Sequence, residues 1–112
     1  MPLTLEGFRL LALGLPEVAE GVHMGHPDFR VRGRIFATLG VPDADSGTVN
    51  LTPEQQVAFV EAEPTIFTPV KGGWGVRGAT NFLLRTASPR TLRPALVTAW
   101  RNLAPKSLTR DR

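Results

Sequence analysis

The chain of 112 residues contains no cysteine, which excludes disulfides, thiolate catalysis and cysteine metal sites together. Long apolar runs are also absent. The longest, from Leu10 to Leu15, is broken by Gly14 and stopped by Pro16, whereas a membrane-spanning helix needs about 20 residues. The start of the chain shows no basic segment leading into an apolar one, so no signal peptide is expected. These absences predict a cytoplasmic protein with no membrane contact.

The composition is that of an ordinary globular protein. Hydrophobic residues make up 42% of the chain and charged residues 21%. A chain of this length can bury one core but not two. We therefore expect a single domain over residues 1–112, and a monomer.

Basic residues are absent from the middle of the chain and concentrated after it. Residues 38–70 contain five acids and no base, whereas residues 71–112 contain nine bases and one acid, Asp111; arginine supplies eleven of the thirteen bases. The planar guanidinium matches phosphate geometry, so a polyanionic partner is one interpretation. A coding genome biased toward arginine, alanine, glycine and proline would give the same counts.

Capping residues predict three helices. The first follows Thr4 and ends at Gly14 and Pro16. The second opens with the capping box at residues 52–55, which has proline at its first helical position, and stops at Pro64. We expect the third to start at Thr91, with Pro94 in its first turn, and to end at Pro105. Helical spacing and strand pattern place these apolar side chains in the core: Phe8, Leu11, Phe36, Leu92, Leu96 and Leu103.

The remaining segments alternate and turn like antiparallel strands. Strands are expected at residues 21–24, 29–32, 34–39, 48–51, 66–70 and 79–85, with turns at residues 32–33 and 45–47. The element order is α-β-β-β-β-α-β-β-α. This order predicts the α+β class, with one antiparallel β-sheet covered by helices.

Short motifs along almost the whole chain match one known family in order. They are Leu15-Pro16, Gly25-His26-Pro27-x-Phe29-Arg30-Val31, Gly33-x-Ile35-Phe36-Ala37, Leu51-x-Pro53-x-x-Gln56, Gly73-Trp74-Gly75, Gly78-Ala79-Thr80, Ala99-Trp100-Arg101 and Ala104-Pro105-Lys106. On these motifs the chain resembles the MmcQ/YjbR family of small bacterial proteins. The resemblance implies a CyaY-like, double-wing α+β fold and a general role in DNA binding, with no catalytic residues to carry over.

Residues for catalysis or metal binding are few. On an extended strand, His23 and His26 would point to opposite faces, so a metal chelate would need the chain to bend at Gly25. We expect His23 on a strand and His26 in the turn before Pro27. The sequence has no zinc-binding helix motif, no nucleophile with a visible base, and no lysine with serine or threonine after its glycine-rich segment. Its serines fit turns and caps. We expect no enzyme activity, no cofactor and no metal.

Two basic segments form the candidate nucleic-acid site. In the first hairpin, Arg30 and Arg32 share strand parity opposite Phe29 and Val31, so the basic pair can face out. A second hairpin is expected over residues 71–85, where Trp74 can stack on a base or pack beneath the loop. The predicted site residues are Arg30, Arg32, Arg34, Lys71, Trp74, Arg77, Arg85, Arg93 and Arg101, gathered on one face.

Two other functions stay open. A non-catalytic module for a protein or a small acidic ligand would use the same arginines, with Trp74 as its anchor. The likeness in fold to CyaY suggests iron handling, which needs an acidic ridge. The first helix offers only Glu6 for such a ridge.

Overall fold

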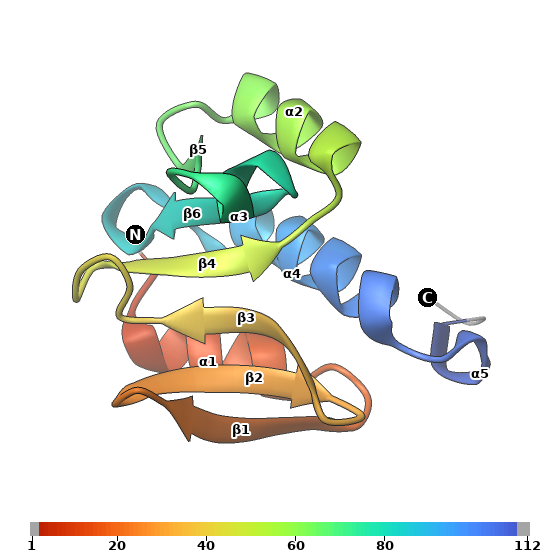
Figure 1. Ribbon diagram of the computed structural model, residues 1–112. Helices are drawn as coiled ribbons and strands as arrows, with labels where there is room; N and C mark the ends of the chain where they lie inside the picture. The colour runs from red at the N-terminus through yellow and green to blue at the C-terminus, as the bar shows by residue number, and fades with distance from the viewer. Residues whose placement is uncertain (1–2, 110–112) are drawn as a thin grey trace.

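The computed structural model describes residues 3–109 and shows a six-stranded antiparallel sheet in the order β1-β2-β3-β4-β6-β5 (Figure 1). The elements in chain order are α1 (Leu5–Leu13), β1 (Val18–His23), β2 (His26–Val31), β3 (Arg34–Leu39), β4 (Ser46–Asn50), α2 (Pro53–Ala62), β5 (Phe67–Pro69), α3 (Gly73–Val76), β6 (Ala79–Leu83), the 3₁₀ turn η1 (Leu84–Thr86), α4 (Pro89–Leu103) and α5 (Lys106–Thr109). The α+β class and the predicted order are confirmed, with α3, η1 and α5 as additions.

The first two helices begin where their caps predict. The Gly7 backbone N–H donates to Thr4 Oγ1 at 2.9 Å at the start of α1. In α2, the Thr52 N–H donates to Gln55 Oε1 at 2.9 Å and the Gln55 N–H donates to Thr52 Oγ1 at 3.2 Å. Each cap satisfies backbone donors that a helix start otherwise leaves unpaired.

The predicted start of the last long helix at Thr91 is wrong. Ser88 is the N-cap of α4, Pro89 is at the first helical position, and Thr91 completes the capping box. Pro94 therefore lies inside the helix rather than in its first turn. Burial of Leu92, Leu96 and Trp100 holds this helix against the sheet despite the missing backbone N–H.

The two N-terminal hairpins have two-residue turns. The predicted turn at Arg32 and Gly33 is confirmed, with φ of 53° and 80°. The first strand, however, spans Val18–His23 rather than residues 21–24, since Met24 and Gly25, with φ of 52° and 81°, form the turn. Positive φ at both central positions is the geometry that matches the twist of a tight hairpin.

The turn predicted at residues 45–47 is wrong, because Ser46 and Gly47 already belong to β4. Gly47 pairs with Phe82, and a Cβ at Gly47 would overlap the Phe82 ring and the Thr38 carbonyl. The glycine is thus needed for packing inside the sheet and not for a turn. The chain reverses over residues 40–45 instead.

The second predicted hairpin over residues 71–85 is also wrong in detail. The strands β5 and β6 do pair antiparallel, but residues 73–76 form the short helix α3 between them. Arg77 is the C-cap of α3 and Arg85 lies in η1. Neither arginine therefore lies on a strand of a hairpin.

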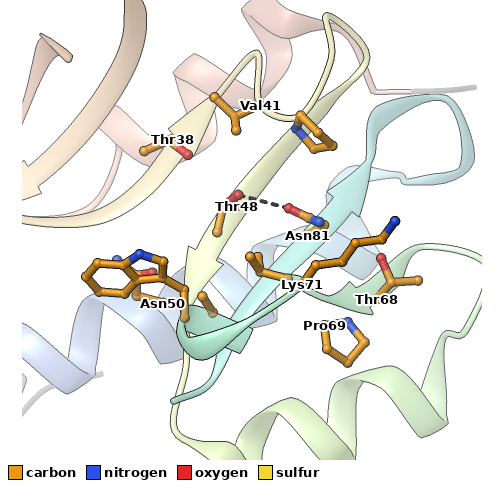
Figure 2. A pocket seen from close by; sticks show the side chains of 12 residues that line it. Thr38, Val41, Thr48, Asn50, Thr68, Pro69, Lys71 and Asn81 are labelled. Atoms are coloured by element: carbon orange, nitrogen blue, oxygen red, sulfur yellow. Dashed lines mark hydrogen bonds between the residues drawn. The ribbon is translucent and has the colours of Figure 1, made fainter. Parts of the chain in front are cut away.

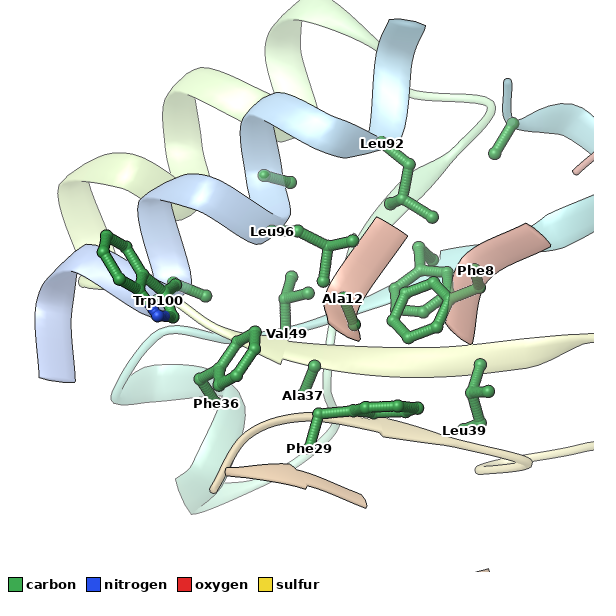
Figure 3. Packing of buried hydrophobic residues seen from close by; sticks show 14 of the residues in the cluster. Phe8, Ala12, Phe29, Phe36, Ala37, Leu39, Val49, Leu92, Leu96 and Trp100 are labelled. Carbon is green, nitrogen blue, oxygen red and sulfur yellow. The ribbon is translucent and has the colours of Figure 1, made fainter. Parts of the chain in front are cut away.

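The core lies between one face of the sheet and the helices α1 and α4, which pack on β1, β3 and β4 (Figure 3). Phe8 stacks on Phe82 with centroids 5.0 Å apart. The predicted burial of Phe8, Phe36, Leu92 and Leu96 is confirmed, while Leu11 and Leu103 are partly buried against the cluster. None of the helices within residues 3–109 has the length and apolar character needed to cross a membrane.

Candidate functional site

The sheet face turned away from α1 and α4 carries polar side chains. Alternation along the strands sets this arrangement: Ala37, Val49 and Phe82 are buried toward the helices. Their strand neighbours Thr38, Thr48 and Asn81 therefore point the opposite way, and all three are partly exposed. We call this side of the sheet the open face; it is turned toward the viewer in Figure 1.

A groove of about 720 Å³ lies on the open face (Figure 2). Strands β3 to β6, the loop after β3 and the segment around α3 all contribute to it. Its lining residues are Thr38, Val41, Pro42, Thr48, Asn50, Thr68, Pro69, Val70, Lys71, Trp74, Ala79 and Asn81. Lys71 is the one charged residue in this set, so the groove offers a cation and no carboxylate.

Trp74 borders the groove and is 70% exposed. The Arg77 guanidinium carbon lies 5.6 Å from the centre of the Trp74 ring. A smaller hollow next to the groove is lined by both residues together with Asn50, Leu51 and Ala79. Of the two interpretations that the sequence leaves open, stacking platform or packed residue, the exposure supports the platform.

The helix α3 that presents Trp74 is fixed from below. Gln56 of α2 is buried, and its Nε2 donates to the carbonyls of Gly75 at 3.0 Å and Ala79 at 2.9 Å. Gly75 is packed so closely on Val70 that a Cβ there would overlap the Val70 carbonyl. The helix that presents Trp74 is therefore held by a buried side chain of α2 and by close packing on Val70.

The floor of the groove holds a hydrogen-bonded pair. Thr48 Oγ1 donates to Asn81 Oδ1 at 3.1 Å (Figure 2). The Asn81 amide nitrogen has no hydrogen-bond partner within residues 3–109. This floor can therefore present amide donors to a ligand.

Arg30 lies on the open face but is already occupied. Its guanidinium binds Asp28 with two hydrogen bonds, Nε to Oδ1 at 2.9 Å and Nη2 to Oδ2 at 3.0 Å. Asp28 is fully buried. The hydrogen bond from Arg30 holds the pKa of the Asp28 carboxyl below its ordinary value, although burial opposes this shift. Arg30 is thus a partner of Asp28 rather than a free cation.

The other two cations of this region differ from each other. Arg32 binds Glu17 through Nε to Oε1 at 2.7 Å and Nη2 to Oε2 at 3.1 Å, which raises the pKa of Arg32. Arg34, which begins β3, forms no ion pair with residues 3–109. Of these three arginines, only Arg34 has no carboxylate partner among residues 3–109.

The remaining predicted arginines lie elsewhere. Arg85 approaches Asp45, Nη1 to Oδ2 at 3.4 Å. Arg93 and Arg101 are exposed on α4, the helix on the opposite side of the sheet from the groove. The fold therefore brings together Lys71, Trp74 and Arg77, and does not gather all nine predicted residues on one face.

The histidine geometry corrects the sequence-based expectation. His26 begins β2 and pairs directly with His23 across the Met24-Gly25 turn. Residues paired in this way point to the same face of a hairpin, because the chain reverses between them. Even so, no group of three or more potential metal ligands occurs within residues 3–109.

Thr38, Thr48 and Asn81, which form the floor, are not among the site residues that the sequence predicts. Their signal was the strand alternation itself, which sets one polar side chain between two buried ones. That pattern indicates only an exposed face, and the groove appears once α3 and the loop after β3 border it.

The YjbR family model matches residues 13–102. The chain belongs to the YjbR family. Among solved structures, the YjbR-family fold seen here is similar to the crystal structure of Deinococcus radiodurans protein DR2400, which carries the family-model domain DUF419, with a TM-score of 0.74 and 16% sequence identity over 97% of this chain and 87% of that chain. At this identity the likeness shows the shared YjbR fold alone. No curated protein matches the chain.

Proposed function

We propose that this YjbR-family protein binds DNA through the groove on its open face, with single strands preferred over duplex. The observation that carries the proposal is the exposed Trp74 ring, which has the Arg77 guanidinium over it and borders the same groove as Lys71. Aromatic side chains next to a basic groove are the common means of holding unpaired bases and their backbone. A paired base in a duplex offers no free face to such a ring.

The backbone contacts come from cations that no carboxylate neutralises. Lys71 lines the groove, the Arg77 guanidinium lies over the Trp74 ring, and neither cation forms an ion pair with residues 3–109. Arg30 and Arg32 lie in the β2–β3 hairpin, but their ion pairs with Asp28 and Glu17 reduce their attraction for phosphate. The proposed interface is therefore the groove and not the β2–β3 hairpin.

The groove also supports a second function, the binding of a small acidic ligand. Its volume of about 720 Å³ lies within the range of small-molecule sites, and Lys71 is its single charged lining residue. This function shares the residues of the first and differs from it in the length of the ligand.

The test is a binding titration of labelled oligo(dT) and of a duplex at two salt concentrations, followed by fluorescence anisotropy. We expect tighter binding of the single strand. Trp74→Ala should weaken it by roughly tenfold or more, because stacking contributes about 1–3 kcal/mol per base. Lys71→Gln with Arg77→Gln should flatten the salt dependence by about 1.4 in slope, since each single-strand phosphate contact contributes about 0.7.

Arg93→Gln is the matched control, because it removes an exposed arginine from α4 on the far side of the sheet. We expect it to bind like the wild-type protein. Equal losses in Arg93→Gln and in the groove variants, or an unchanged Trp74→Ala, would contradict binding in the groove.

A further inference from the structure

Hydrogen-bonding capacity in the groove exceeds what the fold uses. The Thr48 hydroxyl already donates to Asn81 Oδ1, which leaves the Asn81 amide nitrogen with unused donors and the Thr48 oxygen with acceptor capacity. Thr68, across from Asn81 in the strand register, lines the same groove. An edge with both donors and acceptors is complementary to the edge of a heterocyclic base.

The walls around this polar floor are apolar. Val41 and Pro42 from the loop after β3 stand at one side, and Pro69 and Val70 from the end of β5 at another. Trp74, which is 70% exposed, adds an aromatic ring with the Arg77 guanidinium over it. A polar floor between apolar walls accepts a planar ring with its edge down.

The charge of the groove fixes the sign of the ligand. Lys71 extends along the groove past Asn81 toward Thr68 (Figure 2). No acid is among the lining residues, so Lys71 attracts an anionic group and no carboxylate of the lining repels it. A single ammonium group fits a single phosphate as a point charge.

We propose that the groove is a subsite for one nucleotide unit. The base lies against Trp74 with its edge on Thr48 and Asn81, and its phosphate is bound by Lys71. For a unit within a strand, this inference rests on the proposed function; a free nucleoside monophosphate is the other source of the same chemistry. In either case, the affinity of the groove for a nucleotide depends on the hydrogen-bonding edge of the base as well as on charge.

The test compares thymidine monophosphate, thymidine and oligo(dT) by the fluorescence of the full chain. Trp100 is fully buried, so a ligand-dependent change in emission reports Trp74. We expect the monophosphate to bind about threefold to tenfold more tightly than the nucleoside. This preference should disappear in Lys71→Gln and persist in the control Arg93→Gln.

Asn81→Leu removes the base-edge donors and should weaken the monophosphate about tenfold. Thr48→Val is the second variant, because it keeps the side-chain shape in the strand and removes only the hydroxyl; it should weaken binding in the same direction. Near-ultraviolet circular dichroism checks that both variants keep the wild-type fold.

The outcomes separate this inference from the proposed function. If oligo(dT) binds with a Trp74-dependent affinity while the monophosphate does not bind and both floor variants behave as wild type, the nucleotide subsite is overturned and DNA binding stands. If the monophosphate binds as described but oligo(dT) does not, the subsite is supported for a free nucleotide and the proposed function fails. Binding of neither overturns both.

Discussion

Gly25 and Gly78 both have positive φ, 81° and 112°, yet they differ in their surroundings. A Cβ at Gly25 would meet nothing within 4 Å, whereas one at Gly78 would overlap the carbonyl of Leu51. We expect Gly25→Ala to cost about 1 kcal/mol for backbone conformation alone. Gly78→Ala should cost at least about 2 kcal/mol more, because backbone must shift as well. Urea unfolding measures both.

Equal costs for the two glycine variants would contradict this packing between the start of β6 and the end of β4. The comparison also bears on the groove, because Ala79, next to Gly78, lines it.

Asp28 supplies a pH-dependent part of the stability. Its pKa is lowered by the Arg30 guanidinium, so the folded state favours the carboxylate more than the unfolded state does. The stabilisation is therefore fully present above the ordinary aspartate pKa of about 3.9 and is lost as the pH falls through the lower folded value. We expect Asp28→Asn to lower the free energy of unfolding at pH 7, and the difference from wild type to shrink below about pH 4.

Urea titrations across this pH range measure the difference. Glu61→Gln, an exposed change on α2, is the control for loss of one negative charge. A difference between wild type and Asp28→Asn that stays constant down to the lowest pH would contradict the role of the Arg30 pair.

At the scale of elements, α4 carries the main helical contribution to the core. Leu96 lies in the middle of α4 and is 1% exposed. We expect Leu96→Ala to destabilise the protein by about 2–5 kcal/mol, the range for a truncated buried leucine. Val57→Ala, at an exposed position on α2, is the control and should change stability little. A loss for Leu96→Ala no larger than for Val57→Ala would contradict its central position.

Local chemistry explains which elements the sequence predicts. The caps at Thr4 and Thr52 and the turn at Arg32 and Gly33 each depend on a few neighbouring residues, so they are readable from the chain. The sequence did not predict the Met24-Gly25 turn because methionine rarely adopts positive φ. Tertiary packing decided two other differences: Gly47 makes room for Phe82, and Gln56 and Val70 hold residues 73–76 as a helix.

The bulge between β2 and β3 shows the same limit. The register of β2 against β3 shifts between Phe29 and Arg30. As a result, Phe36 and Ala37, which are neighbours in β3, are both buried. Strict alternation would expose one of them. An extra residue in one strand is the feature that allows both to point inward.

At the scale of the whole molecule, the charge asymmetry of the sequence does not translate into one basic face. Arg30 is paired with Asp28 of the same strand, and Arg93 and Arg101 lie on the helical side. Arg32 and Arg85 pair with acids from other parts of the chain. Such pairings depend on segments far apart in sequence, which the spacing of arginines along the chain cannot show. Three of the nine predicted site residues, Lys71, Trp74 and Arg77, come together at the groove.

The most direct test of binding in the groove uses the two tryptophans of the chain, which give two indole N–H signals in a proton–nitrogen correlation spectrum. Trp74 is exposed at the groove, whereas the Trp100 indole is buried and donates to the Pro16 carbonyl at 3.0 Å. On titration with oligo(dT), we predict a shift of the Trp74 indole and the Asn81 side-chain amide, with the Trp100 indole unchanged. Shifts confined to α4, or no shift of the Trp74 indole at saturation, would contradict the account.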